Sequence, residues 1–281
     1  PTEDVEATGF IYYSRFYKLP EGQKLPVGDR LVAGDLGYLK YGVFWGDNNT
    51  FSITFATSDT DKTFWGIKDP DMFEDVTRLI PAAAEWLELE AKPITSVHSM
   101  AGLLNRKRTL CGPNGIVVDS FHLVGDALIC TNPLYGRGCS TGFWQAHLLA
   151  QSIQSNNNDS IAQGERFAQN IEENILPWYS ASVESDKGNR ASSENDEDEL
   201  SVMKKSILKE GLIPATRTSA KVWRAFMKMM NLLAEPKILS EPDVSLEIMR
   251  VWEQRGFRKP DPPLGPSRQE MIEHLQLAEN V

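Results

Sequence analysis

The segment Leu123–Ala150, LVGDALICTNPLYGRGCSTGFWQAHLLA, carries the most informative motif of the chain. Gly125-Asp126 follows an apolar run, Pro133 comes seven residues after the aspartate, and Gly136-Arg137-Gly138 leads into a helix-like pattern. Glycines let a backbone approach a ligand closely, and the free N–H groups and dipole of a helix N-terminus favour negative charge. A carboxylate beside them can accept hydrogen bonds from ligand hydroxyls. The segment therefore predicts a site for a polar, anionic ligand.

Three other interpretations of this segment stay open from spacing alone. The glycines approach the G-x-G-x-x-G nucleotide motif, but Thr141 stands in place of the third glycine and no strand leads into them. Residues 138–142 match G-x-S-x-G, which would make Ser140 a hydrolase nucleophile with His147 or His274 as its base. That motif needs a strand running into the serine, and the proline and glycine ahead of it disfavour one. The third interpretation is an ordinary loop between a strand and a helix.

The first strand is expected near the N-terminus. Residues 10–19, FIYYSRFYKL, are dense in the aromatic and β-branched types that suit a pleated sheet. Because side chains alternate along a strand, Tyr13, Arg15 and Tyr17 share one face of it. A lone arginine between aromatic residues fits a cation–π or edge-charge role as well as a binding role.

More sheet is expected further along. Residues 38–45 and 50–57, joined by the turn-like Gly46-Asp47-Asn48-Asn49, predict an antiparallel hairpin. Residues 95–104 predict another strand. A helical segment over 71–89 interrupts this sheet-rich part of the chain. The first part of the protein is therefore expected to be mainly antiparallel sheet.

Around the motif itself, a strand and two helices are expected. The apolar run between Gly115 and Gly125 predicts a buried strand. Residues 139–153 predict one helix and residues 160–176 a second. The buried stripe predicted for the first of these helices consists of Phe143, Ala146, Leu149, Ala150 and Ile153.

An acidic segment separates this region from the C-terminal part. Residues 184–200 hold seven acidic side chains against Lys187 and Arg190. Such a composition buries too little apolar area to offset the entropy lost on ordering, so it predicts a mobile linker or a long surface loop. The chain beyond it is expected to be helical, with a last helix that begins at the capping box of Ser267 and Glu270.

Composition limits the function classes. The 281 residues carry 29 Lys and Arg against 39 Asp and Glu, a formal net charge of −10, which argues against a nucleic-acid partner. No apolar run approaches the length of a membrane span. Three scattered cysteines and four separated histidines offer no disulfide framework and no metal site, so a cytoplasmic protein without a metal is expected.

The motif residues resemble a known family. Val124-Gly125-Asp126-Ala127, Asn132-Pro133, Gly136-x-Gly138 and the following helix are similar to the second FAD-binding motif of flavoprotein monooxygenases of the p-hydroxybenzoate hydroxylase fold. Residues 8–19 and 100–106 resemble the substrate-side sheet of this group. The resemblance implies that Asp126 binds the ribityl chain of FAD. It also implies that the loop of Pro133, Gly136, Arg137 and Gly138 passes close to the isoalloxazine ring, with Gly125 beside the aspartate.

The resemblance also implies an activity. FAD would take a hydride from NAD(P)H, react with O₂ through a flavin hydroperoxide, and hydroxylate an apolar, aromatic or otherwise electron-rich small molecule. The helix that follows Gly138 would stabilise negative charge on the reduced flavin. Tyr13, Arg15 and Tyr17 would line the substrate cavity, because the sheet covers the flavin in this fold. The protein mostly positions and shields, so no catalytic acid or base is assigned.

The sequence departs from the family in one large respect. Members of this fold begin with a βαβ unit that carries G-x-G-x-x-G, and a second Asp-Gly motif follows; neither is found here. The chain therefore resembles the C-terminal portion of such an enzyme. Three explanations are open: a fragment, one half of a split enzyme whose partner chain supplies the G-x-G-x-x-G domain, or a diverged, non-catalytic interaction protein that has lost the cofactor.

The expected architecture is α+β. A mixed or antiparallel substrate-side sheet is expected over residues 1–114, and a partial FAD-binding α/β layer over 115–180. The acidic linker is expected over 181–203 and a helical C-terminal region over 204–281.

Overall fold

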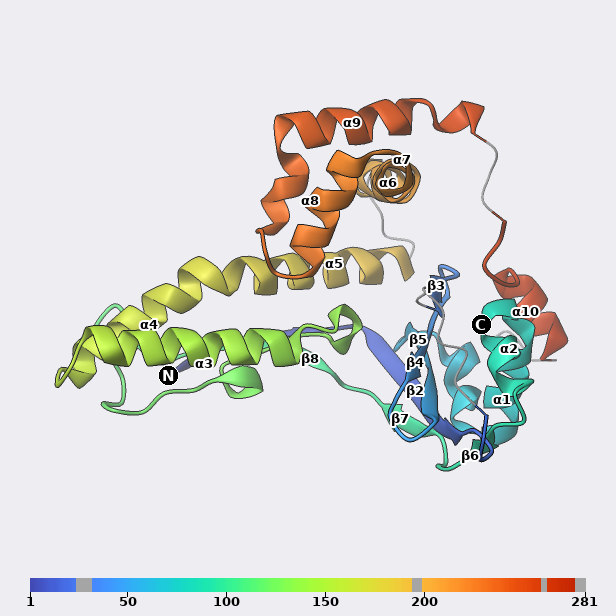
Figure 1. Ribbon diagram of the computed structural model, residues 1–281, viewed down its shortest axis with the longest axis horizontal. Coiled ribbons are helices and arrows are strands. Elements are labelled where there is room, and N and C mark those ends of the chain that lie inside the picture. Colours follow the sequence, from blue (N-terminus) through green and yellow to red (C-terminus); the bar gives the residue numbers. More distant parts are fainter. Residues whose placement is uncertain (24–31, 194–198, 259–261, 276–281) are drawn as a thin grey trace. The chain divides into compact units, whose positions relative to one another are not determined.

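The computed structural model describes residues 1–23, 32–193, 199–258 and 262–275. The chain divides into two compact units, each built from two stretches of sequence (Figure 1). One unit, the helical unit, consists of the described residues of Pro1–Thr8 and Leu104–Lys259. The other, the sheet unit, consists of those of Gly9–Leu103 and Pro260–Val281. These units do not coincide with the expected boundaries at residues 114, 180 and 203.

The sheet unit is built on one antiparallel sheet with the strand order β3-β4-β5-β2-β6, and β7 also pairs with β2. The strands are β2 (Phe10–Lys18), β3 (Val32–Asp35), β4 (Leu39–Trp45), β5 (Thr50–Ser58), β6 (Lys92–Pro93) and β7 (His98–Met100). The expected first strand and the hairpin of β4 and β5 are confirmed. Asn48 and Asn49 adopt the left-handed conformations (φ 52° and 57°) that asparagine tolerates in a tight turn. The strand expected over 95–104 is not continuous: β7 covers His98–Met100, and Leu104 begins another strand, β8 (Leu104–Thr109).

Helices cover one face of this sheet (Figure 1). They are η1 (Lys62–Lys68), α1 (Pro70–Leu79), α2 (Pro81–Leu87) and α10 (Arg268–His274). Asp69 caps α1 by accepting from the N–H groups of Asp71 and Met72, and a proline starts each of α1 and α2. The expected helical segment is therefore confirmed but divided at Pro81. The capping box of Ser267 and Glu270 is confirmed at the start of α10.

The helix-covered face holds the largest core of the protein. Its fully buried side chains include Tyr17, Phe51, Phe55, Phe64 and Phe73. The rings of Tyr17 and Phe51 stack with their centroids 5.2 Å apart, and those of Phe55 and Phe73 join β5 to α1 at 4.9 Å. Stacked and tilted ring pairs of this kind add to the free energy gained from burying the rings.

Burial of Tyr17 makes this unit sensitive to alkaline pH. Loss of hydration raises the pKa of the Tyr17 phenol to about 12, whereas the unfolded chain has a value of about 10. The neutral phenol's contribution to stability is therefore complete below pH ~10 and is lost as the pH rises toward 12. The wild type should lose free energy of unfolding when the pH rises from 8 to 11. We expect this loss to be about 1 kcal/mol smaller in Tyr17→Phe, measured by urea unfolding at both pH values. An equal loss of unfolding free energy in wild type and Tyr17→Phe would contradict the role of the Tyr17 phenol.

The helical unit combines a small antiparallel sheet with three long helices. The sheet has the order β1-β8-β11, formed by Thr2–Ala7, Leu104–Thr109 and Ile129–Cys130, and a two-stranded ladder pairs β9 (Cys111–Gly112) with β10 (Gly115–Ile116). The helices are α3 (Gly138–Ser155), α4 (Ser160–Asn174) and α5 (Leu176–Ser193). They pack around a core that includes Leu128, Leu148, Phe167 and Ile175.

A second helical layer completes this unit. It contains α6 (Glu199–Ser206), the π-helical turn η4 (Ile207–Leu212), α7 (Ile213–Thr218), α8 (Ala220–Met230), η5 (Pro236–Ser240), α9 (Pro242–Glu253) and η6 (Arg255–Phe257). A Cβ on Gly211 would lie 3.0 Å from the Cβ of Trp252, so glycine lets η4 approach α9 closely. The α+β class expected from the sequence is confirmed. No helix within the described ranges has both the length and the apolar character needed to cross a bilayer.

Two local expectations are wrong. Only Gly115–Ile116 of the apolar run forms a strand, and Val117, Val118 and Phe121 are about half exposed. In α3 the buried residues are Gln145, Leu148 and Ser152, whereas Phe143 of the expected stripe is 79% exposed. In both places the apolar pattern is only partly covered: Leu123 and Leu149 pack against the core of the unit, whereas Val117, Phe121 and Phe143 stay exposed.

The expected acidic linker is also wrong where the structure describes it. Helix α5 continues to Ser193, and α6 begins at Glu199. Residues 194–198 lie outside the described part of the chain. Helix α5 is tied to the rest of the unit: Lys187 and Arg190 form ion pairs with Glu6 of the N-terminal segment, and Asp186 is buried among hydrogen-bond donors.

Candidate functional site

The glycine loop is a short turn that ends where α3 begins. Asn132 accepts the N–H of Leu134 and so caps the single turn η3 (Pro133–Tyr135). Gly136 closes that turn in the left-handed conformation, with φ at 61°. A side chain at this position would have open space but a strained backbone. The loop is thus shaped locally by Asn132, Pro133 and Gly136, as the sequence motif indicated.

The N-terminus of α3 has no cap. Arg137 occupies the N-cap position but its side chain caps no N–H of the helix, and the first turn contains no acidic residue. Gly138, Cys139 and Ser140 are all exposed. The first N–H groups of an α-helix have no partner within the helix, and the dipole of these 18 residues adds partial positive charge there. This end of α3 therefore has the chemistry to receive an anionic or hydrogen-bond-accepting group.

Asp126 lies beside that helix end. It is exposed within the 3₁₀ turn η2 (Gly125–Ala127), and a Cβ built on Gly138 would lie 3.9 Å from its Oδ1 atom. The carboxylate is therefore available to a ligand that also meets the first turn of α3. The expected buried strand does not lead into it, so something else holds its position.

Gln145 on α3 supplies that support. Its Oε1 accepts the N–H of Gly125 at 2.7 Å, and Gly125 has a positive φ of 63°. Gln145 is fully buried, and its Nε2 atom has no hydrogen-bond partner among the described residues. A buried, unpaired amide N–H costs free energy unless something else accepts it. Sequence reasoning missed Gln145, because a glutamine in a helix gives no local signal that it is buried.

Arg137 packs the loop against α5. Its guanidinium carbon lies 5.0 Å from the ring centroid of Trp178 and 5.7 Å from that of Tyr135. Burial lowers the pKa of Arg137 from its usual high value. The structure describes no ion pair between this residue and a carboxylate. Arg137 therefore acts through stacking and through a hydrogen bond that its Nη2 donates to Met230 Sδ at 3.9 Å, with its charge not neutralised by an acidic side chain of the described chain.

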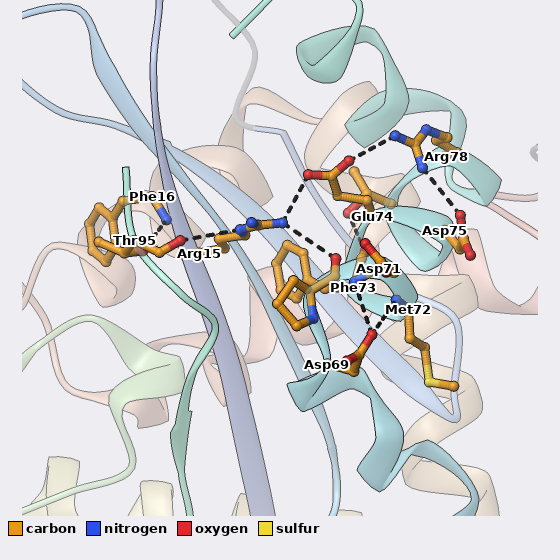
Figure 2. A network of polar contacts seen from close by, with 12 residues as sticks. Arg15, Phe16, Asp69, Asp71, Met72, Phe73, Glu74, Asp75, Arg78 and Thr95 are labelled. Atoms are coloured by element: carbon orange, nitrogen blue, oxygen red, sulfur yellow. Dashed lines mark hydrogen bonds and ion pairs between the residues drawn. The ribbon is translucent and has the colours of Figure 1, made fainter. Parts of the chain in front are cut away.

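The expected substrate residues belong to the sheet unit and face its helix-covered core. Tyr13 and Tyr17 are buried there. The Arg15 guanidinium points from β2 toward α1, where it meets Glu74 Oε1 at 2.8 Å and the carbonyl oxygens of Pro70 and Thr95 at 3.3 Å (Figure 2). These contacts give Arg15 a structural role between strand and helix. The other face of β2 carries Tyr12, Ser14 and Phe16, and the Ser14 hydroxyl meets that of Thr54 at 2.8 Å.

The hydrolase alternative has little support in this geometry. Ser140 lies in the first turn of α3, and the residues before it form the turn η3 rather than a strand. Within the described residues, no hydrogen bond joins Ser140 to a histidine.

Thiol and metal chemistry have no support near the loop either. Burial raises the pKa of the Cys130 thiol, and the charge of Asp126 adds to that effect, which disfavours a reactive thiolate. The described residues contain no group of three or more His, Cys, Asp or Glu side chains arranged to hold a metal.

Two cavities of the helical unit lie away from the loop. One, of about 200 Å³, is polar and includes Gln151 and Arg166. The other, of about 310 Å³, is lined by residues of η4, η5 and α9 among others, including Leu212 and Ile248. Neither includes Asp126 or a residue of 133–138. The candidate site is an exposed surface at the start of α3, formed by Asp126 and residues 138–140.

No family model and no curated protein matches the sequence. Several solved structures are similar in fold. A point variant of HpxO from Klebsiella pneumoniae complexed with FAD gives a TM-score of 0.56 at 13% identity and covers 84% of this chain and 56% of its own. HpxO complexed with FAD and uric acid gives a TM-score of 0.50 at 11% identity, with 94% of this chain and 55% of HpxO covered. A flavoprotein/dehydrogenase from Cytophaga hutchinsonii gives a TM-score of 0.53 at 13% identity, with 91% of this chain and 56% of the neighbour covered.

These likenesses establish the fold. The chain shares its fold with part of each of these structures, and it spans just over half the length of each of them.

Proposed function

We propose that this chain supplies the flavin-facing part of an FAD-dependent oxidoreductase, and that the enzyme is a monooxygenase. The observation that carries the proposal is the uncapped N-terminus of α3, reached through a glycine loop and flanked by the exposed carboxylate of Asp126. The fold supports it, since HpxO has been crystallised with FAD and uric acid. A planar, electron-rich small molecule is accordingly the proposed substrate class, with NAD(P)H as the electron donor.

The residues present fit a flavin. Asp126 would accept hydrogen bonds from ribityl hydroxyls, and the open backbone of Gly136 and Gly138 would let the ring system approach. The free N–H groups of α3 would stabilise negative charge on the pyrimidine side of the reduced ring. Gln145 would hold Gly125, and with it Asp126, against the helix. When bound, FAD supplies the hydride acceptance and the oxygen chemistry.

We further propose that the chain acts as the C-terminal portion of this enzyme, with the dinucleotide-binding domain supplied by another segment or a partner chain. Residues 121–124 belong to no helix or strand, and Phe121 is 51% exposed. Phe143 and Ile153 lie exposed on α3. Exposed apolar side chains on a helix and on a segment outside helices and strands are expected where the elements that would cover them belong elsewhere. The open candidate site is consistent with the same arrangement.

The test is flavin binding by wild-type protein and the Asp126→Ala variant. Loss of one hydrogen-bonded carboxylate should weaken FAD binding roughly tenfold, measured by quenching of flavin fluorescence during titration. Glu172→Ala is the matched control, because it removes an exposed acid of α4 in the same unit. Equal affinities of wild type and Asp126→Ala, or no binding of FAD by the wild type, would count against the proposal.

A further inference from the structure

A buried polar cluster lies directly beneath the glycine loop. Asp186 of α5 is 1% exposed, and its carboxylate accepts three hydrogen bonds. Asn105 Nδ2 donates to Oδ2 at 2.7 Å, while Asn132 Nδ2 and the Tyr135 hydroxyl donate to Oδ1 at 2.9 and 2.8 Å. The cluster thus joins α5 to β8 and to both ends of the turn that precedes Gly136.

The backbone fixes which atom of each amide faces the carboxylate. Asn105 Oδ1 already accepts the N–H of Asn132 at 2.8 Å, and Asn132 Oδ1 accepts the N–H of Leu134 at 3.1 Å. Each amide therefore turns its NH₂ group toward Asp186. Because both NH₂ groups can only donate, position 186 must offer two acceptors.

The carboxylate has no charged partner to account for its burial. The structure describes no ion pair for Asp186 with a lysine or arginine. A carboxylate removed from water without a cation is costly, and full hydrogen bonding offsets that cost only while every donor stays in place. The loop conformation and the burial of Asp186 therefore depend on each other.

We propose that Asp186 is a positioning residue that holds the loop of residues 132–138 in the conformation that presents Gly136 and Gly138 to a ligand. Its effect on the loop follows from the hydrogen bonds alone. Its effect on flavin binding rests on the proposed function.

The test uses donor–acceptor matching at constant shape. Asp186→Asn keeps the size of the side chain but opposes one NH₂ group to another, so amide hydrogen exchange in peptides covering residues 131–138 should speed up roughly tenfold. The double variant Asn105→Asp with Asp186→Asn reverses the roles. The amide at position 186 then donates to the carboxylate at position 105, every other bond is kept, and exchange should return to within about threefold of wild type.

Two further variants complete the set. Tyr135→Phe removes one donor while leaving both amides, so a smaller acceleration, about threefold, is expected even if Asp186→Asn does not fold. Asp243→Asn, at an exposed ion pair with Lys221, should leave the loop unchanged. Peptides of β4 and β5 in the sheet unit give the internal reference for all variants.

The outcomes separate the two proposals. Unchanged loop exchange in Asp186→Asn, or no recovery in the double variant, would overturn the positioning role whether or not flavin binds. If the loop responds as expected, and FAD affinity falls in Asp186→Asn and recovers in the double variant, both proposals gain support. If the loop responds and wild-type affinity for FAD is retained throughout, the link from Asp186 to the ligand is overturned. If the wild type binds no FAD, the proposed function fails and the loop result stands on its own.

Discussion

Truncation of Phe73 to alanine is expected to lower the free energy of unfolding of the sheet unit by about 3–5 kcal/mol. Phe73 is fully buried on α1, and its ring meets that of Phe55 on β5 at 4.9 Å in a tilted arrangement. Removing it loses the transfer free energy of the ring, leaves a cavity between helix and sheet, and breaks an aromatic pair. Urea unfolding measures the loss of stability, and hydrogen exchange of β2 and β5 amides shows that the loss occurs in this unit.

The control for this prediction is Phe44→Ala. Phe44 lies on β4 with 52% of its surface exposed, on the face that α1 and α2 do not cover. Its truncation should cost less than about 1 kcal/mol, because little area returns to water and no cavity forms. Similar losses for the two variants would show that the helix-covered face is not the main core.

Replacement of Gly136 with valine is expected to weaken FAD binding by roughly one to two orders of magnitude. Gly136 has a φ of 61°, a conformation that a β-branched residue adopts only with strain of about 1–3 kcal/mol. A Cβ would meet nothing within 4 Å, so the effect comes from the backbone rather than from a clash. Relief of the strain would move Arg137 and Gly138 and so displace the first turn of α3. Flavin fluorescence titration measures the loss of affinity.

Gly102→Val provides the matched control. Gly102 has a similar φ of 67°, and a Cβ there would also meet nothing within 4 Å, but it belongs to the sheet unit. The variant should carry a comparable strain and retain FAD affinity. Equal weakening by both variants would indicate a general loss of stability instead of a role for the loop.

Sequence alone predicted the elements that depend on neighbours in the chain. The alternation in residues 10–19 and the turn Gly46–Asn49 specify a strand and a hairpin, because pleating and turn chemistry are local. Pro81 divides the helical segment after α1 for the same reason, and the capping box of Ser267 and Glu270 starts α10. The loop from Asn132 to Gly138 was also predicted, since prolines and glycines set backbone angles by themselves.

Burial was predicted less well. The apolar run after Gly115 and the stripe through Phe143 were both expected to be covered, and both are largely exposed. An apolar pattern shows that a surface favours removal from water, but it does not show that the partner surface lies in the same stretch of chain. Conversely, Asp186 was assigned to an acidic linker, although it is among the most buried side chains.

What the sequence by itself determined is therefore the local backbone: the hairpin, the helix boundaries, and the glycine loop with Asp126 near it. The tertiary structure alone decided which polar groups support that loop, namely Gln145 from within α3 and Asp186 from α5, and it paired Arg15 with Glu74. The physical reason is that turns and caps follow from contacts between adjacent residues. A buried hydrogen-bond network depends on groups as many as 81 positions apart, and only folding brings them together.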